Sequence, residues 1–115
     1  MTVLIVDAAN VVGSVPDGWW RDRPGAAERL RDRLALREAG EEIILVVEGA
    51  ARGVESVPGV RVDPAPGSGD DRIVELAAVH AEHGCVVVTA DRELRERVRA
   101  YGARCVGPRA VRPAD

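Results

Sequence analysis

The stretch of sequence that decides the fold is TVLIVDAAN, residues 2–10. Residues 3–6 form an unbroken apolar run without alternating polar positions, which is typical of a parallel strand covered on both faces. Asp7 follows directly, at the carboxyl end of this strand, where open α/β sheets place their ligand crevices. A buried strand that delivers a carboxylate to this edge predicts a functional site, and partners for Asp7 are expected elsewhere in the chain.

Composition indicates one globular domain and excludes several kinds of chemistry. The chain has 115 residues, of which 46% are hydrophobic and 30% charged, enough for a single packed core. All 16 basic residues are arginines, so a P-loop and any other site that needs a lysine ammonium are excluded. The net charge of −3 supplies no global attraction for nucleic acid, and such binding would therefore rely on local arginine clusters.

The cysteines and the apolar runs predict the compartment. Cys85 and Cys105 lie in strand-like apolar stretches, which favours buried reduced thiols over a disulfide framework, and their spacing does not suit zinc. Met1 leads into a strand without a basic leader, and no apolar run approaches the length of a membrane span. We therefore expect a cytoplasmic protein with no membrane partner.

Strand and helix patterns alternate along the chain. Strands are predicted at residues 3–6, 43–47, 60–62, 85–88 and 104–106. Helices are predicted from Pro24 toward Gly40, from Asp70 or Asp71 toward Gly84, and from Asp91 to Tyr101, whereas the Pro- and Gly-rich residues 63–69 should be irregular. The alternation predicts an α/β fold at residues 1–107: a three-layer, Rossmann-like arrangement of about five mostly parallel strands, with the first in the middle and helices on both faces. Residues 108–115 are expected to form a fraying C-terminal tail.

Acidic residues stand where the predicted strands end. Asp7 and Asp91 follow the first and fourth strands, Asp70 and Asp71 open a helix, and Glu48, a weaker candidate, follows the second strand. Carboxylates about 5 Å apart repel by roughly 3 kcal/mol per pair at an effective dielectric near 20. Protons or a divalent cation must neutralise such a cluster. Oxygen-only ligands suit Mg²⁺ or Mn²⁺, which can activate a bound water and clamp a phosphodiester.

Helix capping is the alternative explanation for three of these acids. Asp91 precedes a helical run, where an aspartate cap is worth about 1 kcal/mol, and either Asp70 or Asp71 could cap the preceding helix in the same way. Capping does not explain Asp7, which has no long helix behind it, or two adjacent acids at one helix start. Taken together, the acids favour a shared site. We prefer Asp71 over Asp70 as the ligand because Asp70 is better placed to cap.

Three motifs, VLIVDAAN (residues 3–10), GSGDDRIVELA (67–77) and VVVTADRELRERV (86–98), resemble the signatures of the NYN/PIN-like nucleases. The sequence is most similar to the small bacterial YacP-like NYN proteins. This resemblance implies a PIN-like fold and RNA hydrolysis at one or two Mg²⁺ or Mn²⁺ ions bound by Asp7, by Asp70 or Asp71, and by Asp91. It also implies that Asn10 positions the substrate or the first aspartate, and that Glu93 or Glu48 serves as a further acid.

Candidates for contacting the substrate surround the acids. Trp19 and Trp20, beside Arg21 and Arg23, could stack bases as single-strand binders do, although loop tryptophans more often pin a loop to the domain body. Ser68 and Gly69 could admit a phosphate to a helix N-terminus or simply form the turn. The full predicted substrate-binding set is Asn10, Trp19, Trp20, Arg21, Ser68, Gly69, Thr89 and Arg92.

The leading hypothesis is a Mg²⁺- or Mn²⁺-dependent ribonuclease acting on single-stranded RNA, with Asp7, Asp70, Asp71 and Asp91 as catalytic candidates. One alternative is a phosphohydrolase that uses the same acids on nucleotides or phosphate esters. Another is a non-catalytic RNA-binding or partner-binding module on a PIN-like fold. Metal-dependent turnover separates the enzymes from the binding module, and the sequence leaves a homodimer or a protein partner open.

Overall fold

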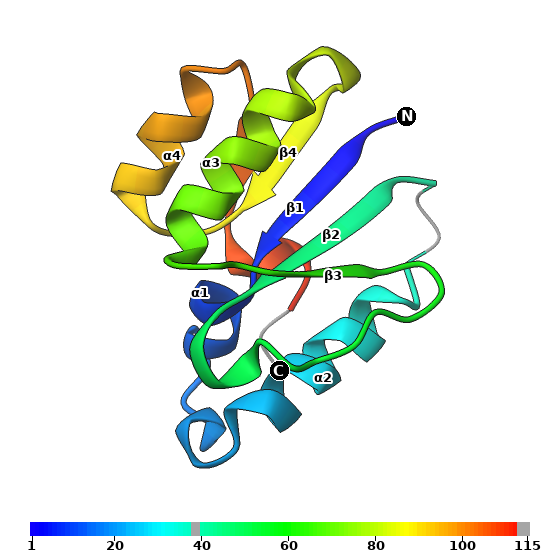
Figure 1. The fold of residues 1–115 in the computed structure, drawn as a ribbon, viewed down its shortest axis with the longest axis vertical. Coiled ribbons are helices and arrows are strands. Elements are labelled where there is room, and N and C mark those ends of the chain that lie inside the picture. Colours follow the sequence, from blue (N-terminus) through cyan, green and yellow to red (C-terminus); the bar gives the residue numbers. More distant parts are fainter. Residues whose placement is uncertain (38–39, 113–115) are drawn as a thin grey trace.

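A single parallel sheet forms the centre of the molecule, with helices on both of its faces (Figure 1). The structure is a computed structural model that describes residues 1–37 and 40–112. Five strands lie in the order β3-β2-β1-β4-β5, which confirms the predicted α/β fold with the first strand in the middle. Their bounds are β1 (Val3–Asp7), β2 (Glu42–Val47), β3 (Arg61–Pro64), β4 (Cys85–Val88) and β5 (Arg104–Val106).

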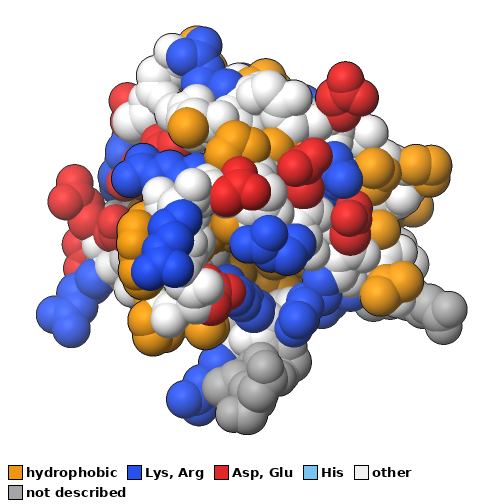
Figure 2. Space-filling view, turned by 90° about the horizontal axis from the view of Figure 1, so that it is seen from below, with side chains coloured by type: hydrophobic (Ala, Val, Ile, Leu, Met, Phe, Trp, Pro, Cys, Tyr) orange, Lys and Arg blue, Asp and Glu red, His pale blue; other side chains and the backbone are white. Residues whose placement is uncertain are grey.

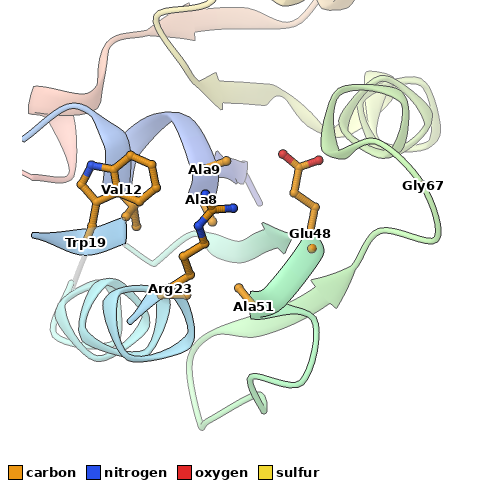
Figure 3. A pocket seen from close by; sticks show the side chains of 10 residues that line it. Ala8, Ala9, Val12, Trp19, Arg23, Glu48, Ala51 and Gly67 are labelled. Atoms are coloured by element: carbon orange, nitrogen blue, oxygen red, sulfur yellow. The ribbon is translucent and has the colours of Figure 1, made fainter. Parts of the chain in front are cut away.

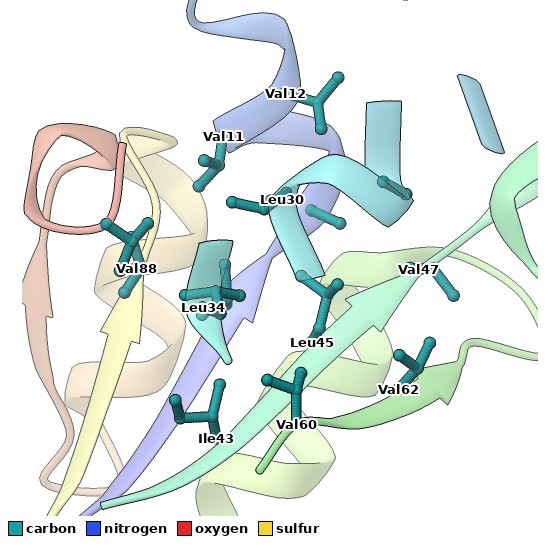
Figure 4. Close-up of a cluster of buried hydrophobic side chains, with 14 of the residues drawn as sticks. Val11, Val12, Leu30, Leu34, Ile43, Leu45, Val47, Val60, Val62 and Val88 are labelled. Carbon is teal, nitrogen blue, oxygen red and sulfur yellow. The ribbon is translucent and has the colours of Figure 1, made fainter. Parts of the chain in front are cut away.

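The central strand β1 is covered on both faces, as its unbroken apolar run predicts. Leu4 and Val6 belong to one core cluster, whereas Val3 and Ile5 belong to the cluster on the opposite face. Figure 4 shows the first cluster, in which side chains of the helix α2 (Arg23–Leu34) pack on the sheet. Because every residue of β1 is buried, the strand fixes the position of Asp7 at its carboxyl end.

Two helices pack on each face of the sheet. The helices α1 (Ala8–Gly13) and α2 contribute to the first cluster, whereas α3 (Gly69–Val79) and α4 (Arg92–Arg99) contribute to the second. Short 3₁₀ turns connect the elements: η1 (Trp19–Arg21), η2 (Gly49–Ala51), η3 (Ala81–His83) and η4 (Pro108–Ala110).

Two of the helices differ from the predicted spans. Helix α2 ends at Leu34, well before Gly40, and α3 ends at Val79 rather than near Gly84. Helix α3 also begins earlier than predicted, because Ser68, rather than either aspartate, caps it.

The edge strand β3 extends further than predicted, through Asp63 to Pro64. Asp63 is buried, and the guanidinium groups of Arg61 and Arg72 satisfy its two oxygens, so a carboxylate is tolerated inside the strand. Pro64 is tolerated because a strand at the sheet edge can lack one ladder donor. The apolar spacing of the sequence does not show this pairing, and residues 63 and 64 were therefore wrongly predicted to be irregular.

The C-terminal segment is docked on the domain as far as Arg112, so the predicted boundary at residue 107 is wrong. Val111 is buried in the cluster formed with α1 and α2. Arg112 pairs with Asp17 and donates to the backbone carbonyl of Val12 at 3.2 Å. The rest of the predicted tail, residues 113–115, lies outside the described residues.

Two further expectations concern the cysteines and membrane spans. Cys85 is buried, as predicted, whereas Cys105 is only partly buried, and both are free thiols. Within the described residues, no helix has both the length and the apolar character needed to cross a bilayer.

Candidate active site

Four acids are electrostatically coupled at the carboxyl edge of the sheet. Asp7 ends β1, Glu48 follows β2, Asp91 follows β4, and Asp70 comes from the first turn of α3. Asp7 is repelled by Asp70 and Glu48, and Asp70 is repelled by Asp91 and Glu48. We call these four residues the acidic cluster. Figure 2, which views the molecule from below, shows acidic and arginine side chains interleaved on one face.

Asp7 is the most deeply buried of these acids, with 6% of its surface exposed. Its Oδ1 accepts a hydrogen bond from the Asn10 amide at 3.3 Å, and its Oδ2 accepts one from the Thr89 hydroxyl at 3.0 Å. Burial raises the pKa of Asp7 to about 6, against the lowering effect of these two hydrogen bonds, and repulsion from Asp70 and Glu48 adds to the rise. Asp7 also caps the short helix α1, so the expectation that capping has no part at this position is wrong.

The side chain of Thr89 connects two of the acids, Asp7 and Asp91, by hydrogen bonds. It is fully buried, and its hydroxyl donates to Asp7 while accepting a hydrogen bond from the Asp91 amide at 3.1 Å. Asp91 in turn caps α4, because its Oδ1 accepts from the Leu94 amide at 3.1 Å. Thr89 was predicted to bind substrate. Its burial instead makes it a residue that positions Asp7 and the loop carrying Asp91.

Asn10 acts in a similar way on the loop after β4. Its side-chain oxygen accepts from the Ala90 amide at 2.8 Å, and its own backbone amide donates to Asp7. The β1–α1 and β4–α4 connections are therefore tied together by direct hydrogen bonds. Of the two roles that the family resemblance implies for Asn10, the contacts favour the positioning of the first aspartate.

The two adjacent acids of α3 differ in their surroundings. Because the Ser68 hydroxyl caps the helix by accepting from the Asp71 amide at 3.1 Å, the capping argument that favoured Asp71 as the ligand is wrong. The Asp71 side chain is 68% exposed and pairs with Arg97 at 2.9 Å. Burial raises the pKa of Asp70, and repulsion from Asp91 and Glu48 adds to the rise. Asp70 is therefore the member of the pair that is coupled to the acidic cluster.

Glu48 is held against the N-terminus of α3. Its Oε2 accepts a hydrogen bond from the backbone amide of Gly69, which is buried and was predicted to contact substrate. A Cβ on residue 69 would lie only 3.0 Å from this oxygen, so a larger residue there would push the Glu48 carboxylate back by a few tenths of an ångström. Gly69 and Ser68 therefore organise the helix start, and Glu48 is held where it repels Asp7 and Asp70.

A cavity of about 280 Å³ adjoins the acidic cluster through Glu48 (Figure 3). Arg23, which the sequence places beside the two tryptophans of the candidate stacking segment, lines it, with its guanidinium carbon 5.5 Å from the centre of the Trp19 ring. Trp19 packs on the core cluster, which confirms that it pins its loop to the domain. The complete lining is Ala8, Ala9, Val12, Trp19, Arg23, Ala27, Glu48, Gly49, Ala51 and Gly67.

The remaining candidates are exposed at the surface. Trp20 is half exposed and lies under Arg21, whose guanidinium carbon is 5.9 Å from the ring centre. Arg92 and Glu93 are exposed in the first turn of α4, directly after Asp91. These side chains are accessible to a ligand at the same edge.

The donor chemistry of the acidic cluster fits Mg²⁺ or Mn²⁺, because all four side chains offer carboxylate oxygens. Among the described residues, no three His, Cys, Asp or Glu side chains are grouped closely enough to form a coordination sphere by themselves. Mg²⁺ is commonly bound by one or two carboxylates together with waters and substrate phosphates, so a preformed three-residue sphere is not required.

Comparison with known proteins identifies the fold. No protein-family model matches the chain, and no curated protein matches it significantly. Among solved structures, the crystal structure of Rae1 (YacP) from Bacillus subtilis, a W164L mutant, is similar with a TM-score of 0.72 and 23% sequence identity. The match covers 93% of this chain and 69% of that chain. The chain therefore has the fold of Rae1 (YacP), as its resemblance to the YacP-like proteins predicts.

Proposed function

We propose that this protein is a Mg²⁺- or Mn²⁺-dependent ribonuclease whose acidic cluster hydrolyses phosphodiester bonds of single-stranded RNA. The observation that carries the proposal is the coupling of four carboxylates from four separate connections at one sheet edge, including a buried Asp7 with a raised pKa. Repulsion of this kind costs stability unless a positive charge offsets it. The fold, which is the one expected for an NYN/PIN-like nuclease, supports the same interpretation.

Each acid has a defined support and a remaining oxygen for an ion. Asp91 uses Oδ1 to cap α4, which leaves its Oδ2, and Glu48 uses Oε2 for the Gly69 amide, which leaves its Oε1. Asp7 is fixed by Thr89 and Asn10, and each of its oxygens keeps a second lone pair. Asp70 is the fourth member of the acidic cluster. A bound divalent ion would lower the pKa of a coordinated water and screen the phosphodiester charge.

Substrate binding would rely on local groups, because the net charge of the chain is −3. Arg92 lies directly after Asp91 and is available to pair with an RNA phosphate. Trp20 and Arg21 offer an exposed ring and a cation for stacking. These residues would affect substrate affinity and its salt dependence rather than the chemical step.

The test is cleavage of a labelled single-stranded RNA by the wild type and by Asp7→Asn, purified in parallel, with Mn²⁺ and with chelator. We expect cleavage only by the wild type and only with the metal. Cleavage that survives the chelator or the substitution would refute the proposal. Failure of the folded, metal-loaded wild type to cleave varied RNAs would favour the non-catalytic RNA-binding module.

A further inference from the structure

The cavity beside the acidic cluster is small and is lined mainly by short side chains. Its volume of about 280 Å³ lies at the lower limit of ordinary ligand pockets, which span roughly 300–1,000 Å³. Alanine and glycine supply most of its lining, so few branched side chains project into it. Trp19 and Val12 close the side nearest the core.

The position of the cavity connects it to the proposed reaction. Ala8, which lines it, directly follows Asp7 in the chain, and Glu48 belongs both to the cavity wall and to the acidic cluster. A ribonucleotide with its phosphate at the acidic cluster would therefore have its base within reach of the cavity. This step rests on the proposed function, because it takes RNA as the ligand of the acidic cluster.

Two charged side chains make the cavity selective. Both line it and come from different elements: Arg23 reaches in from α2, and Glu48 from the end of β2 (Figure 3). Guanine carries acceptors at O6 and N7 and donors at N1 and N2, on different edges of one ring system. Arginine is the usual bidentate partner of O6 and N7, and a carboxylate accepts from the N1 and N2 donors. Adenine, cytosine and uracil carry neither the paired O6 and N7 acceptors nor the paired N1 and N2 donors.

We infer that the cavity is a guanine-binding subsite, in which Arg23 donates to O6 and N7, and Glu48 Oε1 accepts from the Watson–Crick edge through the lone pair that it does not offer to an ion. The alanine walls cover the faces of the ring. The subsite would place the phosphate attached to that guanosine at the acidic cluster, so the enzyme would cleave RNA next to guanine.

The first test uses nucleosides, which carry no phosphate, in buffer with chelator. Guanosine, adenosine, cytidine and uridine are titrated separately into ¹⁵N-labelled wild type, and the amides of Ala8, Ala9 and Ala51 and the Trp19 indole are followed by NMR. We expect guanosine to shift these signals and to bind about tenfold more tightly than the other three. Equal binding of all four nucleosides, or no binding of guanosine, would overturn the inference.

Matched variants locate the site. Arg23→Gln should abolish the preference for guanosine, whereas Arg29→Gln, which makes the same change on the same helix outside the cavity, should keep it. Ala51→Leu should fill the cavity and remove nucleoside binding, and the amide spectrum verifies that each variant is folded. Guanosine binding that persists in both Arg23→Gln and Ala51→Leu would contradict the assignment.

The nucleoside and cleavage experiments separate the two proposals. Metal-dependent RNA cleavage without guanosine binding or guanine preference would keep the ribonuclease and refute the subsite. Guanosine binding without any cleavage would keep the subsite and refute the ribonuclease. Mapping of cleavage positions in a mixed-sequence RNA provides the final readout: the wild type should cut next to guanine, and Arg23→Gln should lose that preference.

Discussion

Among single residues, Asp7 is one whose negative charge lowers the stability of the folded protein. Its pKa rises from 3.8 to about 6 on folding, so the folded protein binds more protons than the unfolded chain between these values. Stability therefore falls as the pH rises through this window, by up to about 3 kcal/mol for a shift of this size. Removal of the charge should therefore stabilise the metal-free protein.

We predict that Asp7→Asn is more stable than the wild type by about 1–2 kcal/mol at pH 8 in chelator, since part of the gain is offset because the new amide nitrogen cannot accept the hydrogen bond of the Thr89 hydroxyl. At pH 4.5 the wild-type side chain is already protonated, so the advantage should disappear. Urea unfolding at the two pH values measures the difference. An equal stability difference at pH 8 and pH 4.5 would mean that the charge of Asp7 does not destabilise the folded protein.

Asp70 and Asp71 form an internal comparison, because both substitutions remove one charge from the same helix turn. Asp70 is coupled to Asp91 and Glu48, whereas Asp71 is exposed and paired with Arg97. We predict that Asp70→Asn lowers kcat by about a hundredfold or more, as expected for residues that act as a unit. Asp71→Asn should stay within a few-fold of the wild type. The reverse order in a steady-state RNA cleavage assay would show that Asp71 is the functional acid.

The sequence was informative about which acids matter and less so about how each is used. Asp7 and Asp91 follow buried apolar strands, and that position is visible in the pattern of residues. The direction in which Asp70 points depends on the start of α3, and Ser68 decides this start through one hydroxyl contact. The burial of Thr89 depends on the packing of β4 between β1 and β5, which no local pattern encodes.

At the scale of elements, the start of α3 is anchored to the edge strand β3. Arg72 of α3 donates to both oxygens of the buried Asp63, each at 2.9 Å, and Arg61 donates a third hydrogen bond at 2.8 Å. The hydrogen bonds from Arg72, together with the nearby positive charges, lower the pKa of Asp63. Because α3 also carries Asp70, this pairing fixes one wall of the acidic cluster.

We predict that Asp63→Asn destabilises the protein by about 1–3 kcal/mol, since it weakens charge-assisted hydrogen bonds to a buried group. Activity should fall as well, at temperatures where the variant is folded. Glu75→Gln is the matched control, because Glu75 contacts the same arginine at 3.3 Å from an exposed position and should cost less than about 1 kcal/mol. Denaturant unfolding with equal losses for both variants would argue against this anchoring role.

At the scale of the whole molecule, the sheet brings together acids that are far apart in the chain. Residue order and apolar runs were sufficient to predict β1 at the centre and β4 beside it. The cavity and the docking of Val111 were not predictable, because both depend on how α1, α2 and the C-terminal segment pack against one another. The place of Arg23 in the cavity wall therefore became visible only when its position over Trp19 was known.

A ligand that binds only the assembled cluster should stabilise the folded chain. We predict that Mn²⁺ raises the free energy of unfolding of the wild type, by about 2.7 kcal/mol at a hundredfold excess over its dissociation constant. Asp70→Asn should lose most of this increment and Asp71→Asn should retain it. Thermal unfolding with and without Mn²⁺ measures the effect, and an identical response of wild type and Asp70→Asn would exclude Asp70 as a ligand.

The most direct test of the acidic cluster as a metal site is a crystal structure of the protein soaked in Mn²⁺, with data collected to reveal anomalous scattering. The account predicts an anomalous peak at the carboxyl edge of the sheet, with oxygens of at least two of Asp7, Asp70 and Asp91 at about 2.0–2.6 Å from the ion. A peak held by Asp71 alone, or no peak at this edge at saturating Mn²⁺, would contradict it.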